Sequence, residues 1–175
     1  MVAATYAHAG QTTRVSSAVA QGNSYSWHPL ISADGRYVAF NSSADNLVAG
    51  DTNGYDDVYV RDRVTGKTTR VSASSAGMQG NKIFGSSNAV ISADGRYVAF
   101  MSDADNLVAG DTNGYDDVFV LDRVKGTTSR VSVSSAGGQG NDPSGLGATS
   151  LFGRMLTTWS PGTKTARAMF LSVTA

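Results

Sequence analysis

The sequence predicts an all-β protein that is built from a repeated unit. All fourteen acidic residues are Asp and none is Glu, and the chain contains twenty Gly, so turn-forming residues replace good helix formers. Fifteen residues, "ADNLVAGDTNGYDDV", stand at 44–58 and return unchanged at 104–118. No stretch shows the apolar spacing of a helix. A repeat without helices indicates similar β units that pack beside one another.

Each repeat contains four short runs that predict β-strands. The connecting segments "ADG", "DTNGYD" and "VTGK" carry Asp, Asn or Gly where the backbone must turn. The runs "RYVAF" and "DVYV" have bulky residues at consecutive positions, which is typical of strands covered on both faces. In the first repeat the runs lie at 29–32, 36–43, 57–64 and 68–74. Four antiparallel strands per unit are typical of a β-propeller blade.

The repeat divides the chain into two full blades and two partial ones. Residues 1–27 supply the outer strand of an incomplete blade, residues 28–87 form the first blade, and residues 88–141 form the second. Residues 142–175 are a diverged remnant of a third blade. When 157–175 is back-translated and shifted by one nucleotide, its codons permit a sequence like the repeat. We therefore interpret this tail as frameshifted.

Two blades alone leave faces uncovered, because a blade buries its faces only against its neighbours. We expect a partial propeller that homo-oligomerisation completes. The tail would make a third blade with residues 12–17 as its outer strand, and two chains would close a six-bladed ring with two-fold symmetry. Edge-to-edge pairing of open sheets is the alternative, because exposed strand edges readily pair.

A longer pattern in the repeat carries a family resemblance. It reads S-x-D-G-x-x-x-A-F-x-S, then V-Y/F-V-x-D, then R-V-S, and it begins at Ser32 and again at Ser92. Over residues 11–141 the chain resembles the TolB-type, WD-like β-propeller repeat family. The resemblance implies a propeller of about six blades, secreted or periplasmic, that binds a protein or a ligand. It implies no reaction, because a fold alone does not specify one.

The duplicated loop is the candidate metal site. Oxygen ligands at alternating positions around a Gly turn suit Ca²⁺, which takes about six to eight oxygens. Asp56 and Asp116 lie nearby, and no Glu stands where an EF-hand needs one. The alternative is that Asp and Asn make turns in a long connection and stay solvated. The predicted ligands are Asp45, Asp51, Asn53 and Asp57 in the first loop and Asp105, Asp111, Asn113 and Asp117 in the second.

Imidazole and aromatic side chains near the first blade give a second candidate site. His28 is the candidate catalytic residue, because it stands beside Trp27 before an innermost strand, where it would face a central channel. Tyr25, Trp27 and Phe84 are candidates for lining a pocket for a small molecule or a glycan. The alternative for all of them is packing in the core between blades.

The "SADG" segments at 32–35 and 92–95 predict tight turns rather than catalytic acids. In such turns Asp caps backbone N–H groups and Gly supplies a positive φ. Arg36 and Arg96 follow these turns, and we expect each to pair with a neighbouring Asp.

Composition argues against several kinds of partner. The net charge is zero, which gives no electrostatic basis for binding nucleic acid or an acidic membrane surface. Cysteine is absent, so disulfides and zinc–cysteine sites are excluded. No apolar run is long enough to span a membrane, and the first ten residues do not read as a signal peptide.

The leading functional prediction is a calcium-binding propeller fragment that self-assembles into a ring and binds a ligand or a protein. The alternative is a metal-dependent hydrolase of phosphoesters or esters, because a divalent ion with an open position activates water. A third reading is a purely structural fragment that binds no ligand.

Overall fold

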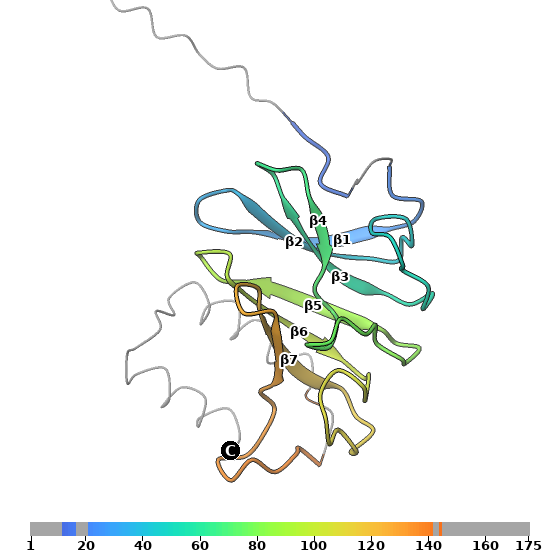
Figure 1. The fold of residues 1–175 in the computed structure, drawn as a ribbon, viewed down its shortest axis with the longest axis vertical. Coiled ribbons are helices and arrows are strands. Elements are labelled where there is room, and N and C mark those ends of the chain that lie inside the picture. Colours follow the sequence, from blue (N-terminus) through green and yellow to red (C-terminus); the bar gives the residue numbers. More distant parts are fainter. Residues whose placement is uncertain (1–11, 17–20, 142–143, 145–175) are drawn as a thin grey trace, which may run out of the picture.

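The computed structural model describes residues 12–16, 21–141 and 144, which form two four-stranded antiparallel sheets and no helix. Figure 1 shows the two sheets packed one over the other. The prediction of an all-β chain with four strands per repeat is confirmed. The first sheet consists of β1 (Ser26–Ile31), β2 (Tyr37–Ser42), β3 (Asp57–Asp62) and β4 (Thr68–Arg70). The second sheet consists of β5 (Ser86–Ile91), β6 (Tyr97–Ser102), β7 (Asp117–Asp122) and β8 (Thr127–Arg130).

The strands lie in sequence order across each sheet, so β1 and β5 are equivalent edge strands. A β-bulge interrupts the pairing of β1 with β2, and another interrupts β5 with β6 at the equivalent place. His28 (φ +48°) and Asn88 (φ +52°) occupy these bulges. Both residue types tolerate the left-handed region better than most others. The two sheets therefore repeat each other even in their irregularities.

The turn between β1 and β2 is the predicted tight turn. The Ser32 hydroxyl and the backbone N–H of Arg36 donate to Asp34 at 2.5 and 3.0 Å, and Gly35 has a φ of +71°. Arg36 in turn donates to both oxygens of Asp62, at 3.1 and 2.8 Å, which confirms the expected pairing. The second sheet repeats these contacts sixty positions later.

A hydrophobic core fills the space between the sheets. Burial of each large apolar side chain contributes about 1.5–3 kcal/mol, so this core is the main attraction between them. Because side chains alternate along β2, Phe40 points to the other face of the first sheet, into a smaller cluster with Leu47 and Tyr59. The buried members of the main core are Ala39, Val58, Val60, Val71, Ala89, Ile91, Val98, Phe100, Ala104, Leu107 and Phe119.

Polar contacts fix how the sheets align, and we call this contact between the two sheets the joint. The Ala33 N–H donates to the Ala93 carbonyl at 2.9 Å, and the Ser86 N–H donates to the Asp56 carbonyl at 2.7 Å. The guanidinium of Arg123 lies over the ring of Tyr37, 4.2 Å from its centroid. Because these contacts are directional and lie at several points, they favour a single alignment of the two sheets.

The N-terminal segment touches the free side of the first sheet. Residues 12–16, where an outer strand is predicted, are not in a strand, but Val15 packs against the cluster around Phe40. The predicted third blade at 142–175 lies outside the described residues except for Ser144. Within the described part of the chain, no helix has the length and apolarity to cross a membrane.

The joint can be tested with two equivalent glycines. A Cβ on Gly95 (φ +70°) would stand 2.2 Å from the Tyr37 ring of the other sheet, whereas a Cβ on Gly35 (φ +71°) meets only the Arg63 side chain at 3.8 Å. Gly35→Ala should cost about 1–2 kcal/mol of unfolding free energy from its backbone alone. Gly95→Ala should cost about 1–3 kcal/mol more, from overpacking. Urea denaturation measures both, and equal losses would mean that Tyr37 moves away freely.

Candidate functional site

The duplicated loop connects β2 to β3 and β6 to β7. Leu47 and Leu107 anchor the two copies, each being at most 2% exposed. Gly50 and Gly54 have φ values of +77° and +71°, which few other residues adopt, and so they set the path of the first copy. The loop is thus a fixed part of each sheet, and it holds its Asp side chains in defined places.

One arginine holds two of the predicted ligands in the first loop. Nη1 of Arg70, at the end of β4, lies 3.1 Å from Asp51 and 3.5 Å from Asp57. These side chains are at most 10% exposed. Asp57 also accepts hydrogen bonds from Ser72 at 2.5 Å and from Asn53 at 3.2 Å. The positive charge beside these buried carboxylates is therefore a guanidinium.

The second loop repeats this arrangement. Nη1 of Arg130 lies 2.9 Å from Asp111 and 3.2 Å from Asp117. Asp117 accepts from Ser132 at 2.5 Å and from Asn113 at 3.1 Å. Sequence reasoning missed both arginines, although one signal was present: Arg recurs in the segment "RVS" after each copy of the loop.

Burial makes these acids depend on their partners. It raises the pKa of Asp57, against the hydrogen bond from Ser72 and the charge of Arg70, which act to lower it. Burial also raises the pKa of Asp111. A raised pKa means that the surroundings disfavour the carboxylate form, so removal of the arginine would leave a poorly solvated negative charge.

The remaining predicted ligands lie apart from these pairs. Asp45 accepts from Asn23 at 2.6 Å, and Asp105 accepts from Asn81 at 2.6 Å and lies 3.1 Å from Lys82. Among the described residues, no group of three or more His, Cys, Asp or Glu side chains is placed to hold a metal ion. Calcium binding stays a prediction.

Residues 79–81 lie between the two sheets along the chain and bridge the two loops. The Gln79 side chain accepts from the backbone N–H groups of Thr52 and Asn53 at 3.1 and 3.2 Å, and its amide donates to the Gly50 carbonyl at 3.0 Å. The Gln79 carbonyl accepts from Asn106 of the second loop at 2.7 Å. We call residues 79–81 the linker, and it ties the loop of one sheet to that of the next.

The linker has counterparts at both ends of the described chain. Before the first sheet, the Gln21 carbonyl accepts from Asn46 at 2.9 Å, just as Gln79 does from the second loop. After the second sheet, the Gln139 amide donates to the Gly110 carbonyl at 2.8 Å, and its oxygen accepts from the Thr112 N–H at 3.1 Å. Each end thus carries one half of the contacts that the linker uses to join two sheets.

The residues of the second candidate site stand in or just before the edge strands, and most of them are exposed. His28 is exposed at the bulge of the edge strand β1, and Trp27 beside it is half-buried. Tyr25 is 83% exposed and Phe84 76% exposed, so neither ring packs in the core between the sheets. The two rings precede the edge strands of different sheets. The structure leaves the catalytic role of His28 and the ligand pocket as predictions.

Comparisons with known proteins add little to this geometry. No protein-family model matches the chain, and a search of curated proteins found no match. Among solved structures, the chain is similar to TolB from Acinetobacter baumannii, with 16% identity and a TM-score of 0.39. The match covers 62% of this chain and 21% of the TolB chain, so this chain spans about a fifth of that protein's length.

The arginine pairs should dominate the stability of the loops. Arg70→Met leaves two buried carboxylates without their cation, and we expect it to lower the unfolding free energy by about 3–5 kcal/mol. Lys82→Met is the control, because Lys82 and Asp105 are each 40% exposed and such a pair contributes about 1 kcal/mol or less. Urea denaturation of both variants measures the difference. Similar small losses would mean that water solvates Asp51 and Asp57.

Calcium binding has its own test in the wild-type chain. Because Arg70 and Arg130 already face the loop carboxylates, we expect that neither added Ca²⁺ nor an added chelator changes the melting temperature. A ligand that binds only the folded state must raise the melting temperature. A rise with Ca²⁺ that the chelator reverses would therefore support the calcium prediction, and Mg²⁺ at equal concentration controls for charge screening.

Proposed function

We propose that this chain is a pair of β-propeller blades that serves as a non-catalytic assembly and binding module, and that the free face of its first sheet accepts a blade from a second copy. The strand order and the regular joint between the sheets support the blade assignment. The following comparison of equivalent residues supports the assembly.

The two edge strands occupy equivalent places in their sheets, but they differ in exposure. Ile91 in β5 is 6% exposed, because it lies in the main core and the first sheet covers it. Its counterpart in β1, Ile31, is 56% exposed. The same isoleucine position is therefore covered in one sheet and open in the other. This difference is the observation that carries the proposal.

The N-terminal segment limits what the second copy would contribute. Val71 follows β4 and packs in the main core, while Val15, in the earlier copy of the same "TTRVS" segment, packs on the cluster around Phe40. An outer segment thus already lies against the free side of the first sheet. The open part is at β1, which the inner strands of another blade would cover. This agrees with the two-chain ring expected from the sequence.

The hydrolase prediction receives no comparable support. His28 is exposed at the bulge of β1, and among the described residues it has no hydrogen-bond partner that would orient its ring for acid–base work. The proposal is therefore limited to assembly and binding, which the exposed apolar face of the first sheet supports.

Light scattering at several concentrations tests the assembly. We expect the wild-type chain to form a dimer and Ile31→Asp to form a monomer, because a buried, unpaired carboxylate opposes association. Val124→Asp is the matched control, since Val124 is 76% exposed in the β7–β8 turn, and it should remain a dimer. Circular dichroism checks that both variants stay folded. A monomeric wild type, or a dimeric Ile31→Asp, would overturn the proposal.

A further inference from the structure

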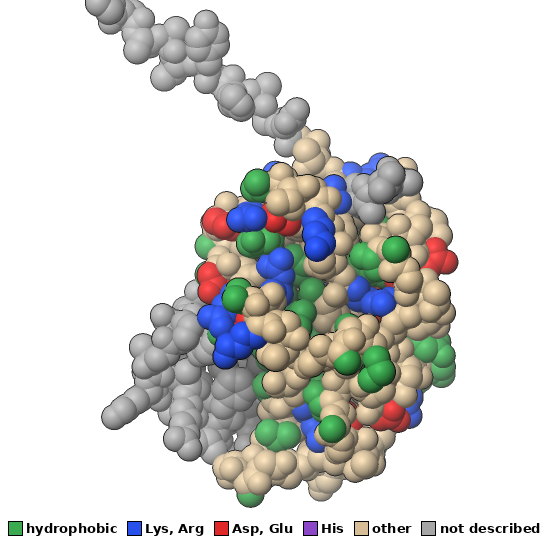
Figure 2. Space-filling view, viewed as in Figure 1, with side chains coloured by type: hydrophobic (Ala, Val, Ile, Leu, Met, Phe, Trp, Pro, Cys, Tyr) green, Lys and Arg blue, Asp and Glu red, His purple; other side chains and the backbone are tan. Residues whose placement is uncertain are grey.

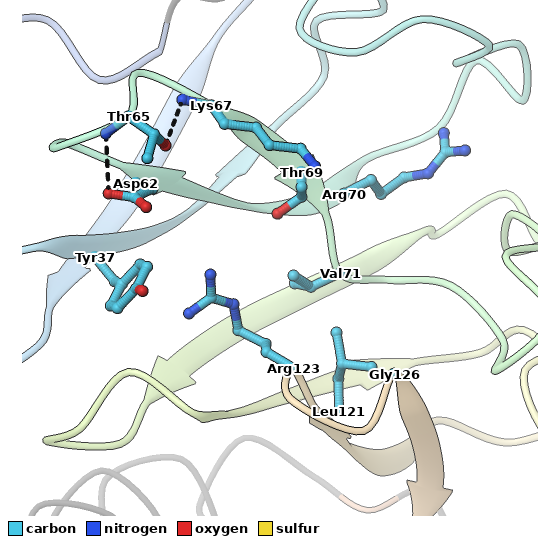
Figure 3. Close-up of a pocket in the computed structure, with 10 residues that line it drawn as sticks. All are labelled: Tyr37, Asp62, Thr65, Lys67, Thr69, Arg70, Val71, Leu121, Arg123 and Gly126. Atoms are coloured by element: carbon cyan, nitrogen blue, oxygen red, sulfur yellow. Dashed lines mark hydrogen bonds between the residues drawn. The ribbon is translucent and has the colours of Figure 1, made fainter.

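A cavity of about 320 Å³ opens at the joint, away from the duplicated loops. Both sheets line it: Tyr37, Lys67 and Thr69 belong to the first sheet and its turns, and Leu121 and Arg123 to the second. In Figure 3, Arg123 reaches from the end of β7 into the space between Tyr37 and Thr69. The volume lies at the lower end of the range for small-molecule sites, about 300–1,000 Å³.

Arg123 is fixed in place but has donors to spare. Its guanidinium stacks on Tyr37, and Nη1 donates to the Gly95 carbonyl. A guanidinium has five N–H donors in a planar fork, so one carbonyl acceptor leaves most of them for another partner. Stacking fixes the plane of the fork, which reduces the entropy that a bound group would have to overcome.

The cavity holds more positive charge than its own acids neutralise. Of the described residues, no carboxylate lies within ion-pair distance of Arg123 or Lys67. Asp62 is in the wall, but Arg36 donates to both of its oxygens. Arg70 is also in the wall, and the loop carboxylates neutralise it. Burial lowers the pKa of Arg123, so its charge lacks full solvation and would gain from an anion.

The surface around the cavity also carries more positive than negative charge. The turns at this end of the sheets, 32–36, 62–67, 92–96 and 122–126, carry six basic residues and four acidic ones. The loops at the opposite end, 43–57 and 103–117, carry nine Asp and no basic residue. In Figure 2, Lys and Arg side chains gather on the side of the molecule where these turns lie. This field draws anions toward the cavity.

We propose that the cavity binds a tetrahedral oxyanion, as found in a phosphate or sulfate group of a small ligand. Arg123 and Lys67 supply the charges. Arginine suits this group because its fork matches two oxygens at once. Both walls belong to one chain, so the site does not depend on assembly.

The site is specific to this joint. Thr127 stands where the second sheet would need the counterpart of Lys67, although Tyr97 repeats Tyr37. A joint formed behind the second sheet would therefore lack the lysine. One oxyanion per chain is the expected stoichiometry.

The test is a titration of the ¹⁵N-labelled chain with inorganic phosphate, and separately with sulfate, at constant ionic strength. We expect saturable shifts of backbone amides in residues 65–71 and 121–126, at one ion per chain. Arg123→Gln and Lys67→Met should each weaken binding by about tenfold, the effect of one charge-assisted hydrogen bond. Lys67 is exposed, so its variant keeps the test valid if Arg123→Gln unfolds.

Arg63→Gln is the matched control. Arg63 is the equivalent of Arg123 and donates to the Gly35 carbonyl at 2.6 Å, but it is exposed and faces no preceding sheet in the described chain. Its variant should bind phosphate as the wild type does. Shifts that do not saturate with either ion, or equal losses in Arg63→Gln and Arg123→Gln, would overturn the proposal.

Discussion

Two carboxylates buried beside one arginine are the constraint on which the rest of the structure depends. Asp51 and Asp57 lose most of their hydration in the loop, and the nearby guanidinium, together with hydrogen bonds from Tyr59, Ser72 and Asn53, offsets that loss. Arg70 supplies this guanidinium from the last position of β4, so the loop, β3 and β4 become one unit. Arg70 also donates to Gln79 at 2.8 Å, and through Gln79 this unit extends to the next sheet.

Most of the fold follows from local sequence patterns, whereas the partner of the loop carboxylates does not. Tight turns and strands are encoded within a few residues, as in the Asp34–Gly35 turn before β2. The arginine pair depends on register: Tyr59 and Arg70 are opposite each other across β3 and β4, which brings the guanidinium back to Asp57. Spacing along the chain identifies oxygen ligands but not the cation that faces them.

The candidate sites show the same division between local and long-range information. The bulges at His28 and Asn88 were detectable in principle, because both residues tolerate the left-handed region and stand at equivalent positions. The cavity at the joint was not detectable from the sequence, since Lys67 and Arg123 line one space only when the two sheets pack together. Sequence patterns describe each sheet well, and the contacts between sheets carry the new chemistry.

The near-identity of the two sheets has a consequence for how the chain acquires its structure. Residues 31–40 and 91–100 are the same ten residues, so either copy of this hairpin segment fits the place of the other. Positions outside this segment distinguish the two sheets, such as Asn41 against Met101 and Tyr59 against Phe119. A chain refolded from denaturant therefore meets crossed pairings of nearly native energy, whereas synthesis on the ribosome lets the first sheet close before its duplicate exists. The order of synthesis thus supplies information that two equal sequences lack.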